Sequence, residues 1–169
     1  MPISRSRLRL PAVLALLVLL APPLAAQAPP PAEAAPAVSE DAALAAWRSF
    51  KAAPLERLAE APTFLRYMQG GAVHTVLNSN LLFWMYKDYP PDAQAVLYAA
   101  YMGGNLESQL ITRKNGDDPE AAMSAVLDAY AALKAKKPEL AIERLDRLTA
   151  ARDEGHFAEA VADLGQGKP

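Results

Sequence analysis

The chain has 169 residues, with 17 basic and 19 acidic side chains and no cysteine. The absence of cysteine excludes disulfide bonds and lipid attachment through a cysteine. A chain of this length can form one domain that buries about two-thirds of its surface, so no covalent cross-link is needed for stability.

The first 28 residues are typical of an export signal. Three arginines near the start precede an apolar run, Ala12–Ala21, and Ala26-Gln27-Ala28 then supplies the small residues that a signal peptidase requires. The apolar run is shorter than the roughly 20 residues that span a bilayer, and an uncleaved anchor is the alternative. We therefore expect a periplasmic or secreted protein with a cleaved signal peptide and no stable membrane span in its mature part.

Cleavage after Ala28 leaves residues 29–169, which carry 14 basic and 19 acidic side chains and thus a formal charge of −5. Nucleic acids and anionic membrane surfaces select basic faces, so neither is expected as a partner. Residues 29–38 are all proline or alanine apart from Glu33 and Val38. This composition has too little apolar bulk to order the chain and predicts a disordered tether.

Residues 39–164 are expected to form an all-α domain, a single compact multi-helix bundle of about seven helices. Ser39 is a typical N-cap residue, and acidic residues follow it where the helix dipole favours them. The buried side of this first helix is predicted from apolar residues three apart, which are Leu44, Trp47 and Phe50. Two short helices are expected before Gly70–Gly71, a pair that suits a helix end.

The predicted centre of the bundle is an apolar helical hairpin. Two long segments without any charged residue lie on either side of Pro90–Pro91, which cannot continue a helix. The spacing of apolar residues predicts one arm over 72–87 and a second over 92–102 that ends at Gly103–Gly104. The β-branched residues at the start of the first arm leave a strand as the alternative there.

The remaining helices are predicted from their start and stop signals. Asn105 is expected to cap a short helix, and Asp118–Pro119 is expected to begin a longer one. Pro138 is expected to begin a further helix that ends at Gly155, and a last short helix precedes a disordered tail, 165–169. Similar apolar pairs 30 residues apart leave an array of helical repeats as an alternative arrangement.

Two polar residues of the first central arm are candidates for a pocket. On a helix, His74 and Asn78 would share one face because they are four residues apart. His74 could then act as a general base or a ligand near neutral pH, and the chain would be a small hydrolase or a ligand-binding protein. The alternative is a buried histidine whose ring bonds to a neighbouring group.

Eight of the twelve aromatic residues lie between positions 64 and 101. Such clusters usually belong to the core, because burial of each ring is worth a few kcal/mol. Tyr86, Tyr89 and Tyr98, however, flank the predicted turn of the hairpin, and tyrosine-rich patches are typical of protein interfaces. These three residues are therefore a candidate patch for a partner, which we expect to be another envelope or secreted protein.

The sequence contains no combination of residues typical of a catalytic or metal site. His74 and His156 are its two histidines, and neither has a second ligand at a metal-binding spacing, so no metal or other cofactor is expected. No nucleophile motif or glycine-rich phosphate loop occurs. The sequence favours a non-enzymatic exported protein that acts by protein–protein interaction. A carrier of an apolar ligand held between the central helices is a further alternative.

Overall fold

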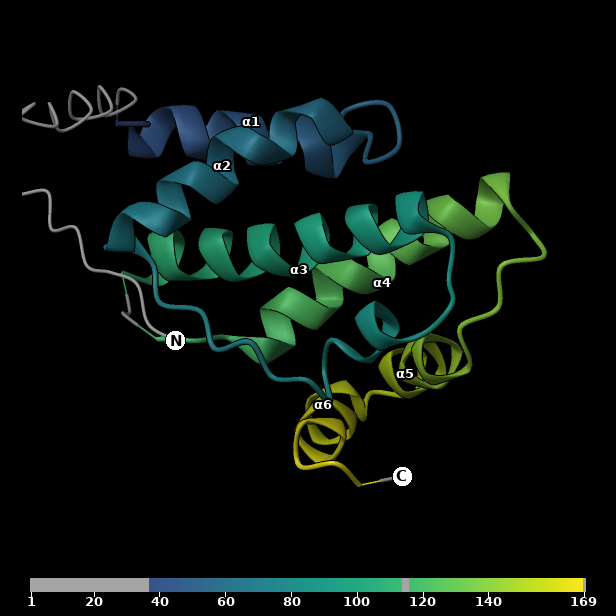
Figure 1. Ribbon diagram of the computed structural model, residues 1–169. Helices are drawn as coiled ribbons and strands as arrows, with labels where there is room; N and C mark the ends of the chain where they lie inside the picture. The colour runs from purple at the N-terminus through teal and green to yellow at the C-terminus, as the bar shows by residue number, and fades with distance from the viewer. Residues whose placement is uncertain (1–36, 114–115, 169) are drawn as a thin grey trace, which may run out of the picture. The chain divides into compact units, whose positions relative to one another are not determined.

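The computed structural model describes residues 37–113 and 116–168 (Figure 1). The expected export signal and residues 29–36 of the expected tether lie outside the described residues. Every regular element within the described ranges is a helix, and the strand considered near residues 72–77 does not form there. The all-α prediction is confirmed.

Six α-helices pack together in the described part of the chain, where the sequence predicts about seven. Their bounds are α1 (Glu40–Ala52), α2 (Ala61–Tyr67), α3 (Pro91–Thr112), α4 (Pro119–Lys136), α5 (Glu143–Asp153) and α6 (Phe157–Gly165). Three short helical turns lie between them, and these are η1 (Leu58–Glu60), η2 (Met68–Ala72) and η3 (Phe83–Tyr86). α1 begins as predicted, because the Ser39 hydroxyl accepts a hydrogen bond from the amide of Ala42 at 3.2 Å.

A helical hairpin lies at the centre of the bundle, but its arms are α3 and α4 rather than residues 72–87 and 92–102. These two helices form the most extensive helix pair in the described chain. Both contribute large side chains that are at most 2 % exposed, among them Leu97, Tyr101, Met123 and Tyr130. The prediction of a charge-free centre is therefore correct for α3 and wrong for its partner.

The glycine pair Gly103–Gly104 lies inside α3 and does not end it. A Cβ atom added at Gly103 would lie 1.9 Å from the Trp47 ring of α1. A Cβ atom at Gly104 would lie 2.7 Å from the backbone oxygen of Ala121 on α4. The predicted helix stop is wrong because these glycines allow two other helices to approach α3 closely; the left-handed residue that ends α3 is Arg113, with φ 56°.

α1 and α2 meet in a cluster of three buried rings, which we call the aromatic corner. It consists of Trp47 and Phe50 of α1 and Phe64 of α2, each at most 1 % exposed. The ring centroids lie between 5.7 and 5.9 Å apart. These spacings are typical of favourable aromatic pairs, so the three rings stabilise the contact between α1 and α2 by apolar packing.

Residues 73–82 form no helix, so the predicted arm over 72–87 is wrong. Gly71, next to the last residue of η2, has φ 81°, and Val73, which follows η2, is extended with φ −134° and ψ 133°. Residues 81–84 are nevertheless at most 6 % exposed and supply the core side chains expected of this segment. The helix prediction fails because the spacing of apolar residues is the same in two cases. It cannot distinguish a helix from an extended chain whose backbone binds side chains of distant residues.

α5 begins at Glu143 rather than at Pro138. The hydroxyl of Tyr130 on α4 accepts a hydrogen bond from the amide of Ile142 at 2.9 Å and donates one to Asp146 at 3.1 Å. Tyr130 thereby fixes the incoming chain in a non-helical form until the first turn of α5. Beyond α6, the amide of Lys168 donates to the carbonyl of Asp163 at 3.0 Å.

Candidate functional site

Residues 73–79, which we call the strap, run from η2 to the end of α6 (Figure 1). The side chain of Gln109 on α3 binds the strap by both of its polar groups. The amide of His74 donates to Gln109 Oε1 at 3.1 Å, and Gln109 Nε2 donates to the carbonyl of His74 at 2.6 Å. In a β-sheet, a neighbouring strand would supply one acceptor and one donor to the backbone of such a residue. Here the side-chain amide of Gln109 supplies both to His74.

A buried polar cluster holds Gln109 in this position. Asn105, one helical turn earlier on α3, is 0 % exposed, and its Oδ1 accepts hydrogen bonds from Gln109 Nε2 at 2.7 Å and from the amide of Asp118 at 3.1 Å. Asn105 Nδ2 donates to Asp117 Oδ1, which also accepts a hydrogen bond from the amide of Val76 at 3.2 Å. Buried amides need such partners, and here the partners include two backbone amides of neighbouring segments.

The opposite edge of the strap has unused hydrogen-bonding groups. The backbone N–H and C=O of Thr75 and of Leu77 make no hydrogen bond to any described residue. The Thr75 hydroxyl is buried and also has no partner among the described residues. Val76 and Leu77 are 62 % and 58 % exposed. The strap is therefore bonded along one edge through His74 and Val76 and free along the other.

An open groove of about 260 Å³ lies beside the strap. Its lining consists mainly of apolar side chains from α2, η2, the strap and α3: Leu65, Met68, Gln69, Val73, Thr75, Leu77, Tyr98 and Met102. Its polar side chains are those of Gln69, Thr75 and Tyr98. An apolar groove beside a free backbone edge is the arrangement that binds extended peptides in β-augmentation.

Tyr101 also lies on α3 and is fully buried. Burial raises the pKa of its hydroxyl far above the usual range for tyrosine, and the nearby Asp117 carboxylate raises it further. The hydroxyl therefore stays protonated at physiological pH and has no hydrogen-bond partner among the described residues. These properties argue against a role for Tyr101 as a general base.

His74 and Asn78 do not share a helix face, because the strap is not helical. His74 is exposed, whereas Asn78 is partly buried and donates from Nδ2 to the carbonyl of Gly165 at 2.9 Å. Asn78 also lines a hollow of about 360 Å³ together with residues 117–120 and part of α6, but His74 does not line it. The predicted shared helix face is therefore wrong, and a functional role for His74 or Asn78 stays a prediction.

The three tyrosines of the predicted partner patch lie in different surroundings. Tyr86 is 72 % exposed at the end of η3, and Tyr89 is partly buried against the core. Tyr98 is partly buried on α3 and lines the groove beside the strap. Of the three, only Tyr98 lines this groove.

Sequence reasoning did not single out Gln109, Thr75 and Leu77, which define the strap and its free edge. One signal was available in α3, where Asn105 and Gln109 lie four residues apart and so face one side of the helix. Two amide side chains on one face of a largely apolar helix indicate a neighbouring segment whose backbone forms hydrogen bonds with them. The free edge itself has no sequence signal, because it depends on which backbone groups other side chains bind.

The described residues contain no group of three or more His, Cys, Asp or Glu side chains placed to hold a metal ion. Within the same residues, no helix is both long and apolar enough to cross a bilayer.

No family model, curated protein or solved structure matches the chain.

Proposed function

We propose that the chain is an exported, non-enzymatic protein that binds another envelope or secreted protein through the strap and the groove beside it. In this proposal an extended segment of the partner lies along the free edge of the strap. Its backbone bonds to Thr75 and Leu77, and every second side chain enters the groove. The export signal predicted in residues 1–28 supports the location of this partner.

The observation that carries the proposal is the free backbone edge at Thr75 and Leu77, bordered by exposed apolar side chains. Unpaired backbone groups on an extended chain are a template for pairing with another chain. The strap can offer this edge without losing its own attachment, because Gln109 and Asp117 bind the other edge. The groove would then select apolar side chains of the partner.

Selection of linear peptides from a displayed library on the full processed chain tests the proposal. Enriched peptides are expected to have apolar residues at every second position. N-methylation of the peptide at alternate positions should weaken binding by at least about ten-fold, because each methyl group removes one backbone donor. N-methylation at the intervening positions should leave binding nearly unchanged. Equal effects at all positions would contradict β-pairing.

A matched pair of variants tests where the peptide binds. Leu77→Asp places a charge at the edge of the groove and should abolish binding. Ile111→Asp makes the same change at a side chain that is 65 % exposed but does not line the groove, and should leave binding intact. Equal loss in both variants would assign the binding to general surface hydrophobicity and remove the strap from the proposal.

The location is tested separately by sequencing the N-terminus of the protein recovered from the cell envelope or the medium. Cleavage after Ala28 is expected. Recovery of an intact N-terminus would instead support the uncleaved anchor.

A further inference from the structure

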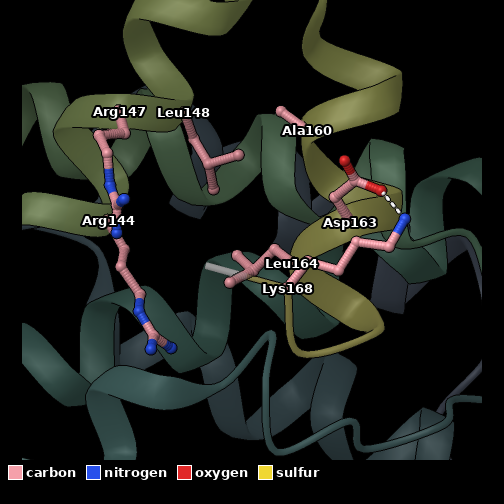
Figure 2. Close-up of a pocket in the computed structure, with 7 residues that line it drawn as sticks. All are labelled: Arg144, Arg147, Leu148, Ala160, Asp163, Leu164 and Lys168. Carbon is pink, nitrogen blue, oxygen red and sulfur yellow. Dashed lines mark hydrogen bonds and ion pairs between the residues drawn. The ribbon is translucent and has the colours of Figure 1, made fainter.

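The surface between α5 and α6 contains a small hollow that is lined by basic and apolar side chains (Figure 2). Its volume is about 220 Å³. Arg144 and Arg147 of α5 lie on one side, and the Asp163–Lys168 pair lies on the other. Leu148 and Leu164, with Ala160, form the apolar part of the lining between the charged side chains.

The two arginines at the hollow have no carboxylate partner among the described residues. The third arginine of α5, Arg152, differs from them because it forms an ion pair with Asp128 at 2.8 Å. Arg147 makes no contact of this kind, and Arg144 lies over the ring of Phe83 at 5.2 Å. A guanidinium above a ring keeps its N–H donors in the guanidinium plane and can still bind an anion.

The side chains that line the hollow have a net positive charge. Arg144, Arg147 and Lys168 carry three positive charges, and Asp163 carries one negative charge. The carboxylate of Asp163 forms an ion pair with Lys168 at 2.6 Å. The net value of +2 contrasts with the formal charge of −5 over residues 29–169. An ammonium group has three donors, so Lys168 keeps two for another acceptor. The hollow is thus a local positive site on an acidic protein.

We propose that this hollow binds a phosphate monoester attached to a short apolar chain. A phosphate monoester carries a charge of about −1.5 to −2 at neutral pH, which matches the local charge. Arginine pairs bind phosphate oxygens by several parallel hydrogen bonds, and the leucines would cover the first carbons of the attached chain. The hollow is smaller than the about 300–1,000 Å³ of pockets for drug-sized molecules, so it would hold the phosphate and only a few carbons.

Titration of the full processed chain with butyl phosphate, followed by amide NMR shifts, tests the proposal. Saturable shifts are expected in residues 144–148 and 160–168, with inorganic phosphate binding more weakly because it lacks the apolar chain. Arg147→Gln should weaken binding by about ten-fold or more, since it removes a charge-assisted bond. Arg152→Gln makes the same charge change on the same helix and should change the affinity by less than about two-fold.

Two results would overturn the proposal. One is the absence of saturable shifts with butyl phosphate. The other is equal weakening by Arg147→Gln and Arg152→Gln, which would indicate attraction to the overall field rather than a site. Flotation with neutral phosphatidylcholine vesicles, with and without phosphatidic acid, then identifies the source of the phosphate. Flotation that depends on phosphatidic acid and on Arg147 indicates a lipid head group, and its absence indicates a free small molecule.

Discussion

The aromatic corner and the strap are both held against α3, but by opposite means. The corner is fixed by three buried rings and by the close approach of Trp47 to Gly103. The strap is fixed by hydrogen bonds from a few side chains, above all the two bonds of Gln109 to His74. Apolar packing loses several kcal/mol when one ring is removed, whereas a partly exposed hydrogen bond contributes about 1 kcal/mol.

The two kinds of attachment differ in how much free energy is needed to release them. Removal of the corner exposes a large apolar area and lowers the stability of the whole bundle. Release of the strap exposes mainly backbone groups that water can bind. A surface that receives a partner by backbone pairing benefits from the second kind of attachment, because it can adjust its position at low cost.

The largest expected effect tests the corner. Trp47→Ala removes a ring that is 1 % exposed, and we expect a loss of about 3–5 kcal/mol in the free energy of unfolding. Urea denaturation followed by circular dichroism measures it. Tyr86→Ala removes a ring that is 72 % exposed and serves as the control, with a change below about 1 kcal/mol. Similar losses in both variants would contradict the assignment of the corner to the core.

Asn105→Ala is expected to have the second-largest effect. It leaves the side chain of Gln109 and the amide of Asp118 without their buried acceptor. A loss of about 2–3 kcal/mol in the free energy of unfolding is expected, since unsatisfied buried groups cost about 1–3 kcal/mol each. A loss below about 0.5 kcal/mol would mean that the polar cluster does not contribute to the stability of the bundle.

Gln109→Met tests the attachment of the strap. It replaces the amide by an apolar side chain of similar length and removes both bonds to His74 together with the bond to Asn105 Oδ1, which keeps the bond from the amide of Asp118. We expect a loss of only about 1 kcal/mol in global stability, because the freed backbone groups can bind water. Hydrogen exchange of the His74 amide should accelerate strongly, while that of the amides in α4 changes only by the global loss. Equal acceleration throughout would show that strap and bundle unfold together.

The smallest expected effect concerns the ion pair between Lys51 of α1 and Glu107 of α3, at 2.8 Å. Desolvation is the largest single effect and raises the pKa of Glu107, but the hydrogen bond from Lys51 and the other lowering contributions, among them the charges of Lys51 and Arg48, together outweigh it. The folded pKa therefore lies below the usual 4.5. The pair therefore contributes stability above pH 4.5, and this contribution is lost as the pH falls through the folded pKa.

Lys51→Gln is expected to lower the free energy of unfolding by less than about 1 kcal/mol at pH 7, because both side chains are partly exposed. Denaturation at several pH values should show that the difference from the unchanged protein shrinks below pH 4.5, the usual value for glutamate. A difference that is constant over this range would assign the effect to lost packing of the lysine chain.

The sequence predicts those parts of the fold that depend on local signals. The capping of α1 by Ser39 and the start of α4 at Pro119 follow from such signals, and both are confirmed. The second central segment, 92–102, was expected to be a helix, and it forms about the first three turns of α3. The charge-free character of residues 69–86 predicts buried side chains, which is correct for residues 81–84 and wrong for Val76, Leu77, Met85 and Tyr86, whose side chains are exposed.

The parts that depend on distant partners could not be predicted. The glycine pair in α3 has the same sequence signal as a helix end, and only the positions of Trp47 and Ala121 distinguish the two cases. The strap has helical apolar spacing, but its backbone is bound by the side chains of Gln109 and Asp117, which lie 35 and 41 residues further along the chain. The partner groove likewise combines α2, the strap and α3, so of the predicted site residues only Tyr98 lines it.

The two adjacent glycines of α3 have a consequence for how this chain can vary. Consecutive residues on a helix point about 100° apart, so each glycine faces a different neighbouring helix. Gly70 and Gly116 have no atom within 4 Å of an added Cβ, and their backbones do not have positive φ. In a saturation scan, substitutions at these two positions would be accepted freely. Every substitution in the α3 pair would have to push Trp47 of α1 or the backbone of α4 away, so these two positions should tolerate far less change than Gly70 and Gly116.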